Sequence, residues 1–255
     1  MKQINFYISE KLQLSKKLAA SNMKPAKQNQ EYKYHPKSRL ALKRLINKRA
    51  TTVRYGEILD LNDIDTSAVD DMSELFKKFN HTNIDISNWD VSNVRTFRAM
   101  FANNNFLKSI GDISNWDVSN AVYMSSMFKS CSQLTTIGKL DDWDVSNVIT
   151  FSGMFESCTQ LSDIGDISLW TVSRSKNFSN MFSFCYSLKS IGDISDWNIM
   201  KTANIMWMFD YCKKIQDLGD LDKWDISKGH TYSAFDNCEQ LKNFPSWYNQ
   251  KTVFV

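Results

Sequence analysis

Histidine is scarce in this chain, and its scarcity limits the chemistry that the chain can perform. The 255 residues contain three histidines, His35, His81 and His230, which lie in three different segments without a repeated partner. No G-x-S-x-G, H-E-x-x-H, phosphate-binding P-loop or dinucleotide-binding glycine cluster occurs. We therefore expect that the protein is not an enzyme and that it uses no cofactor.

Long apolar runs are also missing. No stretch approaches the roughly 20 apolar residues that a membrane-spanning helix requires. Charged residues interrupt Met1–Ala20, whereas a secretory signal needs about 7–15 consecutive apolar residues after a basic start. We expect no contact with a membrane, and a cytoplasmic or virion-associated location.

The chain has no CxxC pair of the kind that binds zinc. Its five cysteines all occupy one position of a repeat, with spacings of 27, 27, 27 and 26 residues. If the repeats stack as helical layers about 9–10 Å apart, their Cα atoms lie beyond the roughly 7 Å limit for a disulfide. We expect a ladder of small, buried, reduced residues: Cys131, Cys158, Cys185, Cys212 and Cys238.

Tryptophan is the most regular feature of the chain. Six tryptophans follow one another at intervals of 27 residues: Trp89, Trp116, Trp143, Trp170, Trp197 and Trp224. A fixed period of this length is typical of a solenoid, in which each coil buries its apolar face against its neighbours. Because the tryptophans recur in phase with other apolar positions, we expect them to form a core and not a surface for sugars or bases.

Within one repeat, the pattern predicts a short strand followed by a short helix. Gly138 marks a bend, and Asp117 and Ser119 are suitable N-caps. Apolar residues then recur at steps of three and four, as on one buried face of a helix: Ala121, Met124, Met127, Phe128, Cys131 and Leu134. The predicted fold is an α/β repeat, a leucine-rich-repeat-like solenoid of about seven 25–27-residue β-plus-helix coils with an N-terminal helical cap.

Aspartates also recur and invite comparison with calcium sites between coils. Calcium needs about six to eight oxygen ligands close together. One aspartate series is broken by Thr171 and Asn198, and the other by Lys139. Roles in caps and turns explain these residues, and we expect no metal.

The charge divides the chain into unlike parts. Residues 1–50 hold 13 Lys and Arg against two acidic residues, whereas the rest holds 18 basic and 26 acidic residues. We predict a basic tail and linker at 1–30, a helical cap at 31–56 with its helix at 36–49, solenoid repeats at 57–244 and a C-terminal cap at 245–255. In the tail, Ile4, Tyr7, Ile8 and Leu12 fall at helical spacing and are candidate docking residues.

The repeat D-I-S-x-W-D-V-S-N-V-x-x-M-x-x-M-F-x-x-C-x-x-L resembles that of the BspA-like leucine-rich-repeat family. The resemblance covers residues 57–244, and Tyr32–Lys48 and Leu61–Phe76 look like the lead-in of Bacteroides-type and phage members. Such repeats occur in mycoplasma-type surface lipoproteins, in gut bacteria and in their phages. The resemblance implies binding or adhesion without catalysis. Surface members carry a lipoprotein or secretion signal that is not visible here, which favours an intracellular or phage-borne member.

Aromatic residues break the repeat at two positions. The tenth residue after each tryptophan is small or polar (Ala99, Ser126, Gly153, Asn180 and, allowing for a deletion, Ala234) except at Trp207. The fourteenth is polar in earlier repeats but aromatic at Phe184 and Tyr211. On a helix, Trp207 and Tyr211 would share one face, with Phe184 beside Tyr211 in the preceding coil. These three residues are the candidate partner-binding site, with oligomer packing or overlay by the C-terminal tail as the alternative.

We therefore expect a non-enzymatic protein-binding or structural scaffold with another protein as its partner. The alternative is a packaged or decorating virion component of a bacteriophage, with the tail as docking signal to virion proteins. Weak nucleic-acid contact through basic residues 24–54 is a third possibility. The partner could instead bind a polar column on the strand side: Lys108/Ser109, Thr135/Thr136, Ser162/Asp163, Lys189/Ser190 and Gln216/Asp217.

Overall fold

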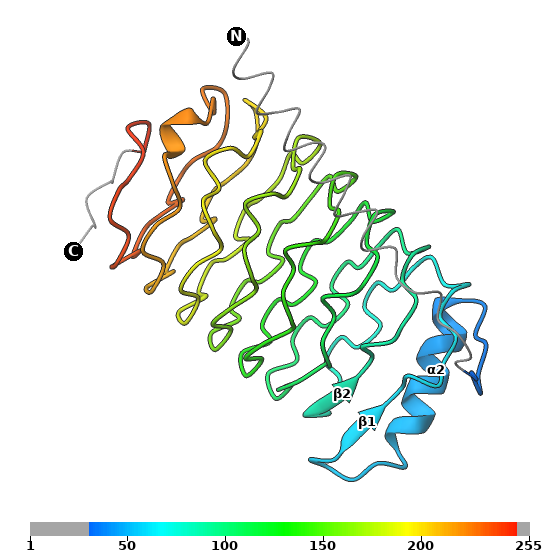
Figure 1. Cartoon of the computed structure of the whole chain (residues 1–255). Helices are drawn as coiled ribbons and strands as arrows, with labels where there is room; N and C mark the ends of the chain where they lie inside the picture. The colour runs from blue at the N-terminus through cyan, green and yellow to red at the C-terminus, as the bar shows by residue number, and fades with distance from the viewer. Residues whose placement is uncertain (1–30, 249–255) are drawn as a thin grey trace. The chain divides into compact units, whose positions relative to one another are not determined.

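The computed structural model describes residues 31–248 (Figure 1). Within this range the regular elements are the helix α2 (Arg39–Ala50), the strands β1 (Ile58–Asp60) and β2 (Asn83–Asp85), and the 3₁₀ helix η1 (Leu221–Lys223). The strands form one parallel pair in which Leu59 lies opposite Ile84. The chain divides into two compact units, Met1–Glu31 and Tyr32–Val255. The predicted docking residues Ile4, Tyr7, Ile8 and Leu12 lie outside the described residues.

The predicted leucine-rich-repeat-like solenoid of seven β-plus-helix coils is wrong. Between residues 31 and 248 the chain consists mostly of turns and loops, and α2 is the only α-helix there. The segments expected to be helices are pairs of tight turns. The N–H of Met127 donates to the carbonyl of Met124 at 3.3 Å, and that of Cys131 to Phe128 at 3.0 Å.

The third residue of each turn explains why no helix forms. Ser126 and Ser130 have φ angles of 56° and 59°, in the left-handed region. A hydrogen-bonded turn with a positive φ at this position is of type II. Two such turns in succession bury apolar residues at steps of three and four, which is also the spacing of a helix. The apolar pattern was therefore compatible with both structures.

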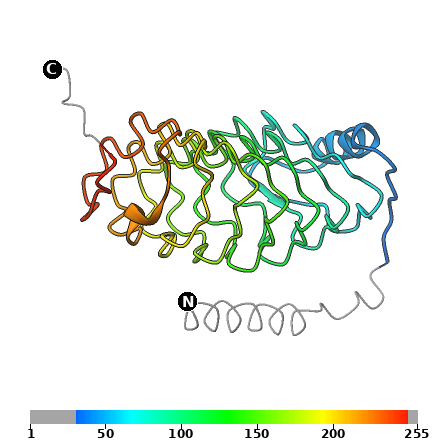
Figure 2. The ribbon, with the colours of Figure 1, turned by 90° about the horizontal axis from the view of Figure 1, so that it is seen from above.

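Neighbouring repeats are joined by hydrogen bonds between their backbones. Phe101 donates to Met127 at 2.8 Å, and Phe128 donates to Met154 at 2.8 Å. Isolated parallel bridges continue this pairing from Thr96 to His230, one repeat at a time. Seen from above, α2 lies at one end of the row of repeats and η1 lies towards the other (Figure 2).

The core runs through the repeats as columns of identical side chains. Phenylalanines from Phe76 to Phe235 stack with their ring centroids 5.3–5.5 Å apart. The six periodic tryptophans are 3–4% exposed, which confirms their expected burial. Each is also fixed by a hydrogen bond, as when the indole N–H of Trp143 donates to Ile113 at 3.2 Å.

The five cysteines are free and buried, as expected. The predicted distance between repeats is wrong, because the stacked rings show repeats about half as far apart as helical layers would be. Each thiol donates to a backbone carbonyl of the preceding repeat, for example from Cys131 to Phe101 at 3.1 Å. Burial raises the pKa of Cys131 to about 12, so this thiol stays protonated at neutral pH.

Helix α2 packs against the first repeats. Ser38 accepts a hydrogen bond from the Ala41 N–H at 3.3 Å and so caps the helix, while Leu42 and Ile46 are completely buried. The Arg49 guanidinium donates to Asp63 at 2.7 Å and to the Asp60 carbonyl at 2.8 Å, which ties the end of the helix to β1. The bounds 31–56 for the cap stay a prediction.

Candidate functional site

The left-handed turn residues form two columns along the repeats. The first column contains Glu74, Ala99, Ser126, Gly153, Asn180, Trp207 and Ser233. The second contains Lys78, Asn103, Ser130, Ser157, Phe184, Tyr211 and Asn237. Ser233 takes the place expected for Ala234, because one residue is missing between Trp224 and His230 and the register moves by one. Ala234 is instead completely buried.

These columns give a new reason for the small and polar residues. A positive φ crowds the Cβ atom, and glycine, asparagine and short polar residues tolerate it best. A bulky side chain in this conformation is an outlier that costs about 1–3 kcal/mol. Phe184, Trp207 and Tyr211 have φ angles of 60°, 55° and 59°. Aromatic residues therefore occupy three neighbouring positions where the backbone conformation is unfavourable for them.

Phe184 and Tyr211 are brought together as predicted, although not by helices. Their rings stack with centroids 5.0 Å apart and an interplanar angle of 17°. Tyr186 packs its ring edge-on against both, at 6.1 Å from Phe184 and 6.3 Å from Tyr211. The Lys213 ammonium lies 6.0 Å from the centre of the Tyr211 ring and forms an ion pair with Glu239 at 2.7 Å.

Trp207 belongs to a second group of rings. Its indole packs edge-on against Tyr232, with centroids 5.7 Å apart. The expectation that Trp207 and Tyr211 share a helical face is wrong, since the two residues lie in consecutive type II turns of residues 205–212. Phe184, Trp207 and Tyr211 are half-buried, so the expectation that they are exposed holds only in part. Together with the exposed Tyr186 and Tyr232 we call them the aromatic surface.

Tyr186 and Tyr232 were missed by the sequence reasoning. Tyr186 is 37% exposed and Tyr232 is 53% exposed, so both contribute more open ring area than a core residue would. Tyr186 breaks a polar column, which was a usable signal, because its earlier members are Asn105, Ser132 and Thr159. The column of Tyr232 holds Ser125, Ser152 and Ser179 but is already apolar at Met206, so its signal is weaker.

An acidic residue, Asp210, lies in the second of these two turns. Asp210 is 8% exposed and accepts a hydrogen bond from the Asn237 amide at 3.2 Å. Its burial, and secondarily the nearby Asp236 carboxylate, raise the pKa of Asp210 above its ordinary value. The aromatic surface therefore lies beside a carboxyl group that holds its proton more strongly than usual.

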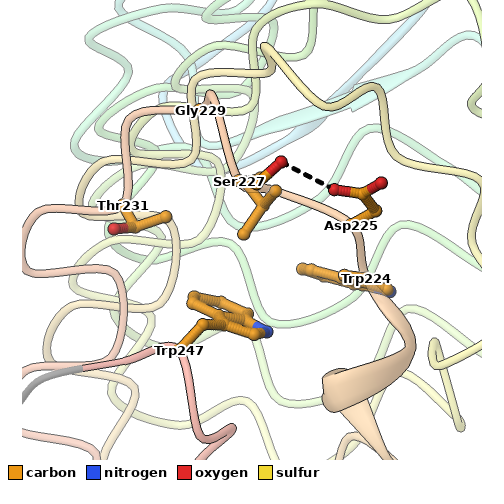
Figure 3. Close-up of a pocket in the computed structure, with 7 residues that line it drawn as sticks. Trp224, Asp225, Ser227, Gly229, Thr231 and Trp247 are labelled. Carbon is orange, nitrogen blue, oxygen red and sulfur yellow. Dashed lines mark hydrogen bonds between the residues drawn. The ribbon is translucent and has the colours of Figure 1, made fainter.

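A pocket of about 350 Å³ lies in the last repeats (Figure 3). Trp224 and Trp247 form one wall, while Gly229 and Thr231 lie on the opposite side. The Ser227 hydroxyl donates to Asp225 at 2.9 Å. The same serine–aspartate bond occurs in earlier repeats, between Ser119 and Asp117 at 2.7 Å, so it is a feature of the repeat turn.

The aspartate columns serve the turns. Asp112, for example, accepts from the backbone N–H of Ser114 at 2.9 Å. In the described range, no group of three or more histidine, cysteine, aspartate or glutamate residues could hold a metal ion. Nor does any helix of residues 31–248 have the length and apolar character needed to cross a membrane.

The other predicted surfaces are less distinctive. Three cations of α2 contact the first repeats: Arg39 donates to the Ser73 carbonyl at 2.8 Å, Lys43 to that of Glu74 at 2.8 Å, and Arg49 as described above. The polar column from Lys108 to Asp217 is exposed, apart from the half-buried Ser162. Neither surface contains a feature that the rest of the row lacks.

Comparison with known proteins gives one match. A family model described as "Mycoplasma protein of unknown function, DUF285" matches residues 46–163 and 133–248. The two matches overlap and together include all six periodic tryptophans. The searches of curated proteins and of solved structures gave no match.

Proposed function

Because the chain belongs to the family of Mycoplasma proteins of unknown function, DUF285, a BspA-like repeat family, we propose that it is a non-enzymatic protein-binding scaffold. Its contact site is the aromatic surface. The observation that carries this proposal is the presence of bulky rings at left-handed positions. The other repeats hold alanine, serine, glycine or asparagine there, except for the first, which holds Glu74 and Lys78.

The conformational cost of these rings supports a role in binding. Serine and asparagine occur at the same two columns in neighbouring repeats and suit the left-handed conformation better. Aromatic residues at Phe184, Trp207 and Tyr211 are therefore not required by the turns. Strained positions of this kind cluster at binding sites, where the strain is offset by function.

The chemistry of the rings also supports a protein partner. Tyrosine and tryptophan are enriched among the residues that supply most of the binding energy at protein interfaces. Tyr186 and Tyr232 offer exposed ring area, and the Lys213–Glu239 ion pair places charges beside the rings. An apolar centre with a polar rim is the usual arrangement of such an interface.

The test replaces the three strained rings with the residue type that other repeats use. In the full chain, Phe184→Ser, Trp207→Ser and Tyr211→Ser together should leave the melting temperature unchanged or raise it. Capture of the partner protein from the native source should be abolished. The matched control is Phe106→Ser with Leu169→Ser, which removes apolar side chains that are 55% and 66% exposed elsewhere. Capture that survives in the triple variant, or that is lost equally in the control, contradicts the proposal.

A second copy of the chain is a competing partner that the same variants address. If wild-type protein is oligomeric in sedimentation and the triple variant is monomeric, the aromatic surface mediates self-association. An oligomer that persists in the triple variant places self-association on a different surface.

The second candidate is a virion component of a bacteriophage, which would make the chain a Bacteroides-type or phage-borne member of the family. The division of charge favours it, because the basic tail is separated from an acidic remainder. The tail would dock to virion proteins through Ile4, Tyr7, Ile8 and Leu12. Removal of residues 1–30 should then abolish co-purification with virions, whereas the triple variant should retain it. Weak nucleic-acid contact through residues 24–54 would appear instead as binding that declines steeply with salt.

A further inference from the structure

One column of the repeat brings acidic residues to the aromatic surface. It consists of the second residue of the second turn in successive repeats: Lys129, Glu156, Ser183, Asp210 and Asp236. The Lys129 ammonium forms an ion pair with the Glu156 carboxylate of the next repeat at 2.8 Å. In this column, an acid can therefore be paired with a cation at the equivalent residue of the preceding repeat.

Ser183 and Asp210 have the same arrangement without the cation. The N–H that follows Ser183 in the chain donates to the Asp210 carbonyl at 2.8 Å. In the same way, the N–H that follows Lys129 donates to the Glu156 carbonyl at 2.7 Å. Ser183 therefore takes the place of Lys129 but supplies no charge.

Two polar groups at this place lack the partners that buried groups usually have. Asp210 is 8% exposed and forms no ion pair with any residue of the range 31–248, and its side-chain partner there is the neutral Asn237 amide. The Ser183 hydroxyl is completely buried and has no hydrogen-bond partner in the same range. Buried carboxylates are normally paired, and buried hydroxyls are normally hydrogen-bonded. Asp210 therefore lacks the cation that Glu156 has.

The rings beside Asp210 suit a cation. The Lys213 ammonium already lies 6.0 Å from the centre of the Tyr211 ring, and the Asp210 N–H donates to the Trp207 carbonyl at 3.3 Å. The faces of tryptophan and tyrosine attract cations, more strongly where water is excluded. In the two repeats that contain the Lys129 ion pair, the left-handed positions hold only small residues: Ser126, Ser130, Gly153 and Ser157. The rings thus occur where the chain itself supplies no lysine.

We propose that the aromatic surface receives a lysine side chain of its protein partner, which pairs with Asp210 and packs against Trp207 and Tyr211. The ammonium stands to Asp210 as that of Lys129 stands to Glu156, and the methylene groups of the side chain contact the rings. This inference rests on the proposed function, because it names the chemistry of the partner at the same surface.

A lysine peptide tests the proposal on the full chain without the partner. Acetyl-Gly-Lys-Gly-amide should shift the NMR signal of the Trp207 indole N–H saturably. The matching norleucine peptide, which lacks the ammonium, should shift it several-fold less. Asp210→Asn should weaken binding of the lysine peptide about tenfold, because hydrogen bonds to charged groups are the stronger ones. Glu156→Gln is the matched control and should bind the peptide as wild type does, since Glu156 has its own lysine.

A second measurement follows the charge of Asp210 directly. Burial raises the pKa of Asp210, and a neighbouring ammonium should lower it. The carboxyl carbon signal of Asp210 should therefore titrate at lower pH when the lysine peptide is present. Ser183→Lys should have the same effect without the peptide, and it should abolish peptide binding by placing an ammonium beside Asp210. If this variant does not fold, Asp210→Asn still decides the question.

Three results would overturn the proposal: no saturable shift, equal shifts with the lysine and norleucine peptides, or equal binding by wild type and Asp210→Asn. Failure of the proposed function is seen separately, in partner capture. Capture that is lost in the triple serine variant but unchanged in Asp210→Asn leaves the aromatic surface as the contact site and removes the lysine. Capture that survives in the triple variant contradicts the proposed function itself.

Discussion

The interior repeats and the last repeats share one sequence pattern, but the last repeats depart from it at several positions. Between Trp116 and Trp170 the left-handed positions hold only small residues: Ser126, Ser130, Gly153 and Ser157. In the last repeats, Phe184, Trp207 and Tyr211 put large rings at the same positions. The register also loses one residue before His230, and Thr231 interrupts an apolar column. In the regular region the repeated apolar positions all serve packing. The irregular region contains the aromatic surface.

The largest expected difference between the two regions is in the free energy of unfolding that is lost when a tryptophan is replaced by alanine. Trp143→Ala removes a side chain that is 3% exposed and packed on both sides, so the free energy of unfolding should decrease by about 3–5 kcal/mol. Trp247→Ala should cost much less, because Trp247 is partly exposed and lies at the end of the row. Chemical denaturation measures both. Equal losses would mean that the end of the row is as tightly packed as its interior.

The sequence predicts which side chains are buried, but it does not predict the conformation of the backbone. The 27-residue period predicts which side chains are buried, because a core column needs the same apolar residue in each repeat. It does not distinguish a helix from two type II turns, since both bury residues at steps of three and four. Small residues at Ser126 and Ser130 were the available signal for the turns, and they were interpreted as exposed helix positions instead.

The candidate site was predictable to a similar degree. Phe184 and Tyr211 occupy equivalent positions of adjacent repeats, and any stacking of repeats in register brings such positions together. Tyr186 and Tyr232 lie in other columns, so comparison of the two chosen columns missed them. Contacts between different columns depend on the backbone path, which the period alone does not determine.

Glycine substitutions test how closely the interior repeats approach one another. Gly138 has a φ of 90°, and a Cβ atom there would collide with the Asp112 carboxylate of the preceding repeat. Gly138→Ala should therefore combine backbone strain of about 1–3 kcal/mol with the displacement of Asp112. Gly56 is the matched control, since its φ is 94° but a Cβ atom would meet nothing within 4 Å. The two losses, measured by chemical denaturation, should differ. Equal losses would show that Asp112 moves aside without cost.

The pH dependence of stability also distinguishes the two regions. Glu156 and Asp210 occupy the same position of the repeat, but their surroundings differ. In the interior, Glu156 is paired with Lys129 at 2.8 Å. In the last repeats, Asp210 has an amide partner and a nearby carboxylate, and burial raises its pKa above its ordinary value of 3.8. The folded protein therefore holds this proton more strongly than the unfolded chain. The contribution of Asp210 to stability is greatest below pH 3.8 and is lost as the pH rises through its folded pKa.

Asp210→Asn should remove this dependence. At neutral pH the variant should be more stable than wild type, because an amide avoids the cost of a buried carboxylate and can still accept from Asn237. Glu156→Gln is the control and should not stabilise, because it weakens an ion pair. Thermal melts between pH 3 and pH 8 measure both variants. If the melting temperatures of wild type and Asp210→Asn change with pH in the same way, Asp210 is not the source of this pH dependence.

The smallest expected effect is the order in which the cysteines react. Burial raises the thiol pKa along the column, to about 12 at both Cys131 and Cys238, so little thiolate is present at neutral pH. Cys131 is completely buried, whereas Cys238 is 6% exposed and lies in the last repeat. A maleimide reagent should therefore leave the interior cysteines unmodified in the native protein and modify Cys238 slowly, through local opening of the end. Mass spectrometry of digested samples at increasing times measures this order. Modification of Cys131 before Cys238 would mean that the interior repeats open first, contrary to the difference between the two regions.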